Sequence, residues 1–296
     1  MRRLYLVDSS IYVFKAWFSL PDTLCNRLGQ QNNAWLGFTD FAYQFLKIEK
    51  PRQLVFAFDE SLKHSARKEI YPEYKANRSP APEELVRQFR WCRDWVSALG
   101  YTEVASDRHE ADDLIGTLTE LHRSDDCAIT ILTADKDLAQ LIRQHDTWWS
   151  FATGQQLTYR GLIKKFGVKP EQIADQLALA GDKVDNIPGI PGIGMTIAGR
   201  LLCKFGSLDN LRANLDDVNK MKFRGSDRIM NLLKEHEAIL DISAQLTPTD
   251  NQVAAMNDVP ITRSSPNQEK LLSMMDEQGM DSSRRQKWLA LTGLES

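Results

Sequence analysis

Nine acidic side chains stand at positions of this chain that suit the binding of divalent cations. They are Asp8, Asp59, Glu110, Asp112, Asp113, Asp135, Asp137, Asp182 and Asp185. Carboxylates gathered in one place repel one another unless cations neutralise them. Hard divalent ions prefer oxygen ligands, and Mg²⁺ suits a site made mainly of carboxylates and water. The nine acids therefore predict a magnesium site.

Each acid taken alone has an ordinary explanation. An Asp directly after a strand is more often a helix N-cap than a metal ligand, which applies to Asp8 and Asp59. Glu110 and Asp113 lie three residues apart, and at a helix N-terminus they would complement the macrodipole. The two acids of TADKD fit a cap and a surface residue equally well. The joint pattern favours the metal site, because four segments bring acids to one edge of a predicted sheet and a helical part adds two more.

The elements that must position these acids alternate between strand and helix over the first 150 residues. The runs RLYLVD, QLVFAFD and AITILT are typical of buried strands, and TEVA and TWWSF of shorter ones. Helices are expected at residues 12–18, 34–46, 83–99, 110–122 and 136–143. Such alternation predicts an α/β fold with a mostly parallel central sheet flanked by helices. Sites in such sheets lie beyond the carboxyl ends of the strands, where Asp8, Asp59 and Asp135 fall.

The rest of the chain is expected to be mostly helical. The segments LIKKFG, EQIADQLALAG and IAGRLLCKFG each end in glycine, a usual helix stop. The stretch from 243 to 266 is rich in Thr, Asn, Pro and Ser, and is interpreted as a connector with room for one short strand. We predict an α/β domain at 1–156 that includes a charged segment at 61–82, a helical region at 157–242, and a connector with two C-terminal helices at 243–296.

Composition and charge are compatible with a globular protein that binds nucleic acid. The 296 residues are 42% hydrophobic and 26% charged. No apolar run approaches the roughly 20 residues that span a bilayer, and the N-terminal run is too short for a signal peptide. Four scattered cysteines give no zinc knuckle or redox pair and suit a reducing cytoplasm. The net charge of −3 does not exclude nucleic acid, because the nine acids carry −9 by themselves.

Two further segments suit nucleic acid. Residues 63–78 carry a net charge of +3 with Tyr71 and Tyr74 interleaved. This composition suits single-stranded DNA through phosphate pairing and base stacking, and fits a solvated loop equally well. The glycine-rich stretch 189–194 precedes a helix that begins near Met195, so its backbone could approach a phosphate. A simple tight turn is the alternative; a P-loop is excluded because no GK[ST] follows.

Several motifs in succession resemble the 5′-nuclease family. They are VDSS, FAFD, YPEYKANR, EADDLIGTL, TADKDLAQLI and GDKVDNIPGIPGIG. That family includes the N-terminal domain of bacterial DNA polymerase I, phage 5′-exonucleases and flap endonucleases. The resemblance covers about residues 1–240, in the same order and spacing. It implies a PIN-like fold with a helix-hairpin-helix region, and a metal-dependent 5′-3′ exonuclease or flap endonuclease acting on DNA with 5′ ends or flaps.

The resemblance also implies that all nine acids belong to a site for two Mg²⁺ ions, for which Mn²⁺ can substitute. The neighbours of one ion would be Asp8, Asp59, Glu110, Asp112 and Asp135. Those of the second would be Asp137, Asp182 and Asp185, with sharing between the two. Two ions about 3.5–4 Å apart would activate water and stabilise charge on the phosphate oxygens.

The resemblance extends to the substrate. Segment 61–82 resembles the helical arch that admits a 5′ single strand, and the predicted catalytic residues are Lys75, Arg78 and Asp135. The stretch 189–194 resembles the helix-hairpin-helix element, which binds the duplex backbone, often with a K⁺ ion held by main-chain carbonyls. The predicted DNA contacts are Lys15, Arg67, Tyr74, Lys75, Arg78, Gly189, Ile190, Gly192, Ile193, Gly194, Arg200 and Lys204.

Some features leave alternatives open. Ser9, Lys183, Val184 and Thr196 depart from the family's common pattern, although none of them removes a carboxylate. A non-catalytic DNA-junction binding protein of the same fold is disfavoured, because a pure binder has no use for so much negative charge near phosphate. A ribonuclease of related sheet architecture is disfavoured by the arch and the hairpin. We expect a cytoplasmic monomer that ends at Ser296 without a polymerase domain, makes no membrane contact and works in replication or repair.

Overall fold

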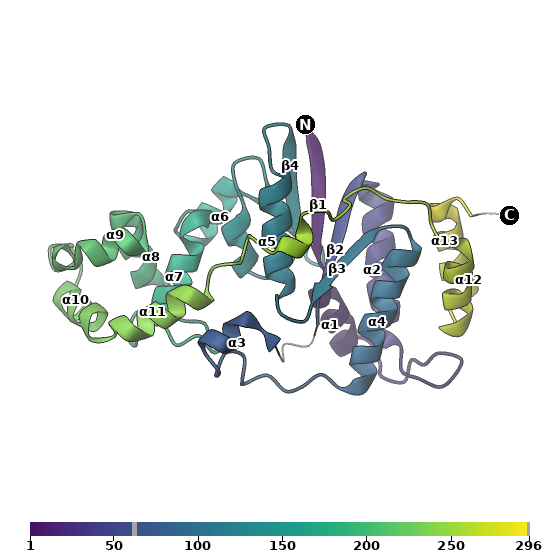
Figure 1. Cartoon of the computed structure of the whole chain (residues 1–296), viewed down its shortest axis with the longest axis horizontal. Helices are drawn as coiled ribbons and strands as arrows, with labels where there is room; N and C mark the ends of the chain where they lie inside the picture. The colour runs from purple at the N-terminus through teal and green to yellow at the C-terminus, as the bar shows by residue number, and fades with distance from the viewer. Residues whose placement is uncertain (61–63, 295–296) are drawn as a thin grey trace.

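The computed structural model describes residues 1–60 and 64–294, so the charged segment expected at 61–82 is described from residue 64 onward. One sheet runs through the middle of the molecule (Figure 1). Its strands are β1 (Arg2–Asp8), β2 (Gln53–Asp59), β3 (Thr102–Ser106), β4 (Cys127–Leu132), β5 (Thr147–Ser150) and β6 (Gln155–Thr158). The helices connecting these strands are α1 (Ser9–Ser19), α2 (Asn33–Glu49), α3 (Ala66–Ile70), α4 (Glu83–Ala98), α5 (Ala111–His122) and the 3₁₀ helix η2 (Asp137–Leu141).

The strand order β3-β2-β1-β4-β5-β6 confirms the mostly parallel sheet. Strands β1 to β5 pair in parallel, and β6 adds an antiparallel edge that the sequence reading did not include. Chain order reverses between β1 and β4, because β2 and β3 lie on one side of β1 while β4 and β5 lie on the other. Crevices beyond the carboxyl ends of strands at such a switch point are where sheets of this kind bind ligands.

Alternating side chains on the strands divide the core into two layers. Leu4 and Leu6 of β1 pack in the layer that contains α5, whereas Tyr5 and Val7 pack in the layer that contains α1, α2 and α4. Successive residues of a strand point to opposite faces, so each buried strand serves both layers at once. This explains why RLYLVD and QLVFAFD are continuously apolar rather than alternating with polar residues.

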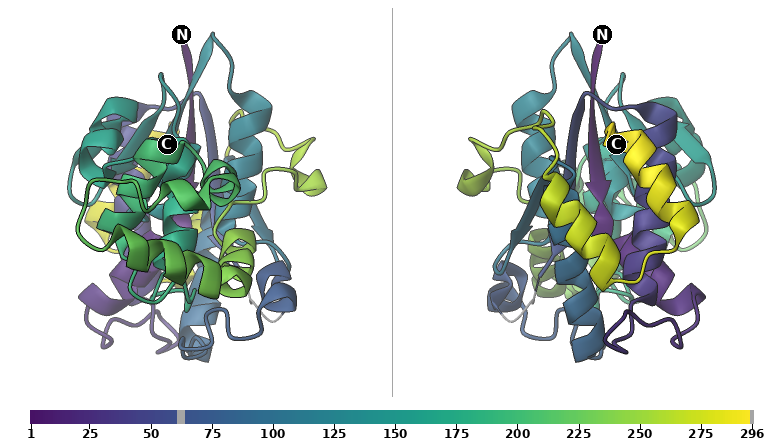
Figure 2. Two further views of the ribbon diagram at one scale, coloured as in Figure 1. Left: turned by 90° about the vertical axis from the view of Figure 1, so that its left-hand side faces the viewer. Right: turned by 90° about the vertical axis from the view of Figure 1, so that its right-hand side faces the viewer.

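Helices of the region after β6 gather at one end of the molecule (Figures 1 and 2). They are α6 (Tyr159–Phe166), η3 (Pro170–Gln172), α7 (Ile173–Ala180), α8 (Met195–Phe205), α9 (Leu208–Ala213), η4 (Leu215–Asp217), α10 (Ser226–Glu235) and α11 (Glu237–Leu246). Two elements cross the expected boundaries, since β6 continues the sheet past residue 156 and α11 runs past residue 242. No helix among the described residues is long and apolar enough to cross a membrane.

One expected helix is shorter and of a different kind. The helix predicted at 136–143 is present as the 3₁₀ helix η2, which covers only Asp137–Leu141. Leu138, Ala139 and Leu141 are all buried, and Ile142 already has an extended backbone. The chain must leave the helix at this point to reach β5, which allows no second turn.

The tail packs on the opposite end of the molecule from the helical region (Figure 1). After the 3₁₀ helix η5 (Ala254–Met256), the connector pairs with the first residues of β2, where Leu54 N donates a 2.9 Å hydrogen bond to Ile261 O. Helices α12 (Gln268–Glu277) and α13 (Ser282–Thr292) follow, as expected of the tail. Trp288 of α13 is 1% exposed and packs edge-on against Trp95 of α4 and Tyr43 of α2.

We expect Trp288→Ala to lower the free energy of unfolding by about 3–5 kcal/mol, the usual loss when a buried aromatic side chain is truncated. Denaturant unfolding followed by far-UV circular dichroism measures this change. Lys287→Ala is the matched control, because Lys287 is the exposed neighbour on the same helix. Equal midpoints for the two variants would mean that the tail does not contribute to the core.

Candidate active site

The first acids lie at the carboxyl ends of neighbouring strands. Asp8 ends β1 and Asp59 ends β2, and both continue the side-chain series that faces α5. Asp8 is 4% exposed and accepts a 2.8 Å hydrogen bond from Thr133 Oγ1, just beyond β4. Asp59 Oδ1 accepts a 2.9 Å bond from Ala111 N at the start of α5. Strand alternation and parallel register therefore suffice to bring these two carboxylates to one place.

The next acids come from the N-terminus of α5 and the turn after β4. Burial, followed by the charges of Asp135, Asp8, Asp59 and Glu110, raises the pKa of Asp112 well above its usual range. Burial and then the charge of Asp59 do the same to the pKa of Asp8. These mutual effects mean that the five carboxylates lie within electrostatic reach of one another. These are the five acids that the resemblance assigns to the first ion, and they lie in one neighbourhood of the structure.

Asp137 continues this group toward the helical region. Its main-chain N–H donates a 2.8 Å hydrogen bond to Asp135 Oδ1. Burial and then the charge of Asp135 raise the pKa of Asp137 to about 7. Lys136 extends from the same turn and pairs with Asp182 Oδ2 at 2.5 Å. The turn after β4 therefore links the sheet acids to those of the loop after α7.

That loop, residues 181–189, is closed tightly by its own backbone. Asp182 and Ile187 exchange main-chain hydrogen bonds of 2.9 and 2.7 Å. Gly181 and Gly189 have φ values of +74° and +57°, and a Cβ on Gly189 would lie 2.1 Å from Gly181 N. Only glycine fits where two backbones approach so closely. The loop carries Asp182, 7% exposed, and the partly buried Asp185, and the charges of both contribute to the raised pKa of Asp137.

The segment that was expected to form an arch rests on this loop. Lys75 Nζ lies 2.6 Å from Glu110 Oε2 and 3.5 Å from Asp185 Oδ2, and Arg78 pairs with Asp185. The buried Tyr74 hydroxyl lies between the same two acids, 3.2 Å from Glu110 and 3.3 Å from Asp185. Two residues predicted as catalytic thus lie among the acids, where their charges offset the carboxylates.

Main-chain contacts fix the same segment to the loop. Asn77 Nδ2 donates to Lys183 O at 3.0 Å, and Asn186 Nδ2 donates to Glu73 O at 2.7 Å. The Lys75 N–H donates to Asp185 O at 3.0 Å. Asn77, Asn186 and Lys136 were absent from the predicted site. Their motifs, YPEYKANR, GDKVDNIPG and TADKD, had been singled out, but single polar residues in a loop carry no sequence signal of a partner far along the chain.

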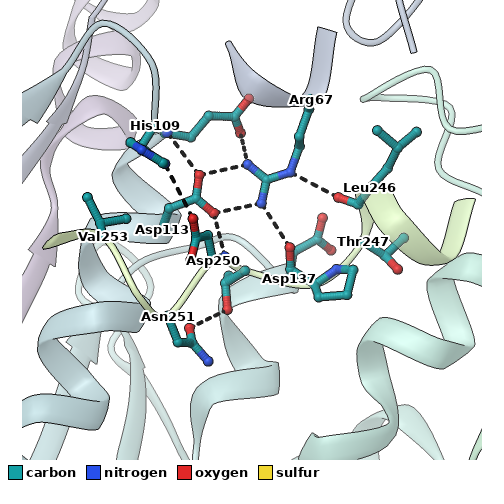
Figure 3. A network of polar contacts seen from close by, with 12 residues as sticks. Arg67, His109, Asp113, Asp137, Leu246, Thr247, Asp250, Asn251 and Val253 are labelled. Atoms are coloured by element: carbon teal, nitrogen blue, oxygen red, sulfur yellow. Dashed lines mark hydrogen bonds and ion pairs between the residues drawn. The ribbon is translucent and has the colours of Figure 1, made fainter. Parts of the chain in front are cut away.

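Two predicted functional residues are engaged elsewhere. Asp113, expected at the metal site, receives a two-pronged ion pair from Arg67 at 2.8 and 2.7 Å, together with the N–H groups of Glu110 and Asp250 (Figure 3). Arg67, expected to contact DNA, also donates to Leu246 O and Pro248 O. These contacts argue against both roles, because the oxygens of Asp113 and most donors of Arg67 already have partners.

The remaining acids have the chemistry of a divalent-cation site. Glu110 Oε1 is buried and has no hydrogen-bond partner among the described residues, which is costly unless something positive meets it. In this conformation no three His, Cys, Asp or Glu side chains of residues 1–60 and 64–294 stand close enough together to hold one ion. The donors are all carboxylate oxygens, carried by two strand ends, a helix N-terminus, a turn and a loop, and such a set fits Mg²⁺.

The glycine-rich hairpin presents its backbone to solvent at one corner. Gly194 is exposed, caps α8, and has no atom within 4 Å of where a Cβ would stand. Arg228 was not among the predicted contacts. Its Nη2 lies 3.5 Å from where a Cβ on Gly192 would stand. Ile190 and Ile193 are each 2% exposed, so their side chains belong to the core and only their backbones could reach DNA.

The other predicted DNA contacts divide into exposed and buried groups. Lys15 on α1 and Arg200 and Lys204 on α8 are exposed, as a phosphate contact requires. Tyr74 is 2% exposed, which leaves no ring face for a base, so stacking by this side chain is excluded in this conformation. Gly189 is also buried, and its N–H donates to Ser243 Oγ of α11 at 3.3 Å.

Family models match nearly the whole described chain. Residues 3–167 match the 5′-3′ exonuclease N-terminal resolvase-like domain, and residues 168–269 match the 5′-3′ exonuclease C-terminal SAM fold. A 5′-3′ exonuclease of Aquifex aeolicus is 34% identical over 86% of this chain and 87% of its own length. DNA polymerase I of Bacillus caldotenax is 32% identical over 95% of this chain, which spans only 32% of that polymerase.

Solved structures share the fold at lower identity. A bacteriophage T5 flap endonuclease in complex with DNA and metal ions superposes with a TM-score of 0.66 at 20% identity, covering 94% of this chain and all of the other. The catalytic core of Rad2 with a DNA substrate has a TM-score of 0.62 at 17% identity, covering 98% and 91%. Two successive family models and the Aquifex relative establish that this chain belongs to the 5′-3′ exonuclease family.

Proposed function

We propose that this chain hydrolyses DNA phosphodiester bonds at or near 5′ ends and flap junctions, as a metal-dependent 5′-3′ exonuclease and flap endonuclease. One observation supports the proposal: acids at the ends of β1 and β2, at the start of α5 and in the turn after β4 lie within electrostatic reach of one another, and Lys75 and Arg78 pair with Glu110 and Asp185 of the same group. Negative groups that can hold cations and positive groups that can meet a phosphate are the two requirements of this chemistry. The names of the Aquifex and T5 relatives support the same activity.

Eight of the nine acids would hold the ions. Asp8, Asp59, Glu110, Asp112 and Asp135 suit one Mg²⁺, and Asp137, Asp182 and Asp185 suit a second, with Mn²⁺ as a substitute. Asp113 is left out because its oxygens already accept from Arg67 and two main-chain N–H groups. Bound ions of this kind polarise a phosphate oxygen and lower the pKa of bound water.

Lys75 and Arg78 would act on the scissile phosphate. Their present partners are Glu110 and Asp185, two of the acids assigned to the ions. With cations held at those acids, Lys75 and Arg78 would lose part of this attraction and would become available to a phosphate. Tyr74, through Asp185, and Asn77, through the carbonyl of Lys183, would keep the segment at the loop when these longer side chains turn to a phosphate.

The helical region would bind the duplex backbone. Gly192 and Gly194 leave main-chain N–H groups open at the N-terminus of α8, which favours an anion, and a K⁺ ion held by hairpin carbonyls would fit the same contact. Arg200, Lys204 and Arg228 add positive charge nearby. We also propose a cytoplasmic monomer in replication or repair, in which residues 1–156 form the nuclease domain and residues 157–242 the helical DNA-binding region.

We expect Asp135→Asn to abolish cleavage of an end-labelled 5′-flap substrate, because it removes an acid shared by several neighbours in the cluster. Wild-type cleavage should stop in EDTA and return with Mg²⁺ or Mn²⁺. Asp22→Asn, at an exposed acid outside the cluster, should leave the rate unchanged. Cleavage that continues undiminished in EDTA would contradict a metal-dependent mechanism.

Lys75→Ala should lower the single-turnover cleavage rate by about 10²–10³, the usual effect of removing one group that stabilises developing charge. Lys68→Ala is the control, since it removes the same charge from α3 of the same segment. Rapid-quench measurement at saturating enzyme separates this effect from binding. If Lys75→Ala cleaves as fast as the control, the segment is only a solvent-exposed loop without a role in cleavage.

Gly194→Leu should weaken binding to a duplex-containing substrate more than binding to a single strand. The position has open space and a φ of −98°, so the added side chain strains neither the packing nor the backbone. Fluorescence anisotropy at one fixed salt concentration measures both affinities, because phosphate binding is salt-dependent. Ala290→Leu, at an exposed position of α13, adds similar bulk at the far end. Equal losses on both substrates would reduce the hairpin to a simple turn.

A further inference from the structure

Arg67 is the most extensively engaged cation of the described chain. Its side chain is 12% exposed, and its Nε and Nη2 groups donate to Leu246 O at 3.0 Å and to Pro248 O at 2.9 Å. Nη1 and Nη2 also form the two-pronged pair with Asp113 (Figure 3). Four of its five N–H donors therefore have partners within the protein, and Nη1 lies 3.8 Å from Glu110 Oε2. Such a group has little left to offer a DNA phosphate.

Asp113 connects Arg67 to the acids at the start of α5. Its Oδ2 accepts from the main-chain N–H of Glu110 at 3.0 Å, and its Oδ1 accepts from that of Asp250 at 2.8 Å. Asp113 thus caps the first turn of α5, the turn that carries Glu110 and Asp112. Burial alone would raise the pKa of Asp113, but the hydrogen bonds and charge of Arg67 lower it below its usual range.

The carbonyl groups of Leu246 and Pro248 connect Arg67 to the side of the molecule where the loop at residues 181–189 lies. Leu246 is the last residue of α11, and Ser243 of the same helix accepts a hydrogen bond from Gly189 N. Gly189 closes the loop that bears Asp182 and Asp185. Arg67 therefore touches one helix that positions acids of the first proposed ion and another that contacts the loop of the second.

We propose that Arg67 is a positioning residue that, through Asp113 and α11, sets the spacing between the acids of the sheet and the acids of the helical region. The inference rests on the proposed metal-dependent function and assigns to Arg67 and Asp113 a role different from DNA contact and metal ligation. The planar guanidinium is essential, because it directs donors to a carboxylate and to two carbonyls at fixed angles. A lysine keeps the charge but has no such fork.

Mn²⁺ binding to the full-length protein without DNA tests the inference, by isothermal titration calorimetry. We expect Arg67→Lys to weaken Mn²⁺ binding about 10–100-fold, the usual effect of removing a residue that orients metal ligands. Its affinity for a duplex at fixed salt should match wild type, and so should the salt slope, which falls by about 0.9 for each lost phosphate contact. Arg108→Gln is the matched control, because Arg108 links the same segment to the α5 turn through an exposed pair with Glu69.

A double-mutant cycle separates positioning from ligation. If Arg67 and Asp113 act as one unit, Arg67→Gln with Asp113→Asn weakens Mn²⁺ binding no more than either single change does. The double variant also leaves no lone buried charge, so it serves if a single variant does not fold by near-UV circular dichroism. Losses that add would mean that Asp113 binds an ion by itself, and would overturn the proposal.

Two other outcomes are decisive. If Arg67→Lys binds Mn²⁺ as wild type does, or loses duplex affinity together with one phosphate contact in the salt slope, Arg67 is not a positioning residue. If wild-type protein binds no divalent ion, the proposed function fails and the inference fails with it. If the wild type binds Mn²⁺ and the Arg67 variants bind it equally well, the inference fails while the proposed function stands.

Discussion

Mutual repulsion among buried carboxylates is the constraint on which the rest of this structure depends. Asp8, Asp112 and Asp137 all have raised pKa values, first through burial and then through neighbouring acids. Positive side chains meet this charge from three directions. Lys136 comes from the turn after β4, Lys75 and Arg78 come from the segment after α3, and Arg67 comes from α3 itself. These ion pairs hold together, at this point, elements that are far apart in the chain.

Local patterns in the sequence were enough to predict the sheet and the first group of acids. Short continuous apolar runs that alternate with helical patterns are typical of strands buried on both faces, and parallel strands bring their carboxyl ends to a common edge. The position of Asp8 and Asp59 follows from this rule alone. The edge strand β6 was missed because its four residues are mostly exposed and carry no apolar pattern.

Long-range pairing is what the sequence could not supply. Arg67 looked like one more cation of a basic segment, and its burial depends on carbonyls about 180 residues away. Asp113 looked like one more acid of EADD, and only the fold shows that its oxygens already have donors. Ile190 and Ile193 were grouped with their hairpin glycines, although their side chains fill the core. Spacing identifies which residues are near a site, whereas side-chain direction decides what each of them does.

Because alternating residues of β1 pack in two different layers, the length of this strand is constrained during evolution. Leu4, Leu6 and Asp8 face one layer, and Tyr5 and Val7 face the other. Inserting or deleting one residue within the strand would exchange the two layers and turn Asp8 away from its neighbours in the same step. A change in the length of β1 would therefore damage the packing of the core and the acid cluster together, never only one of them. The long surface segments carry no such penalty, and insertions in this lineage should accumulate there.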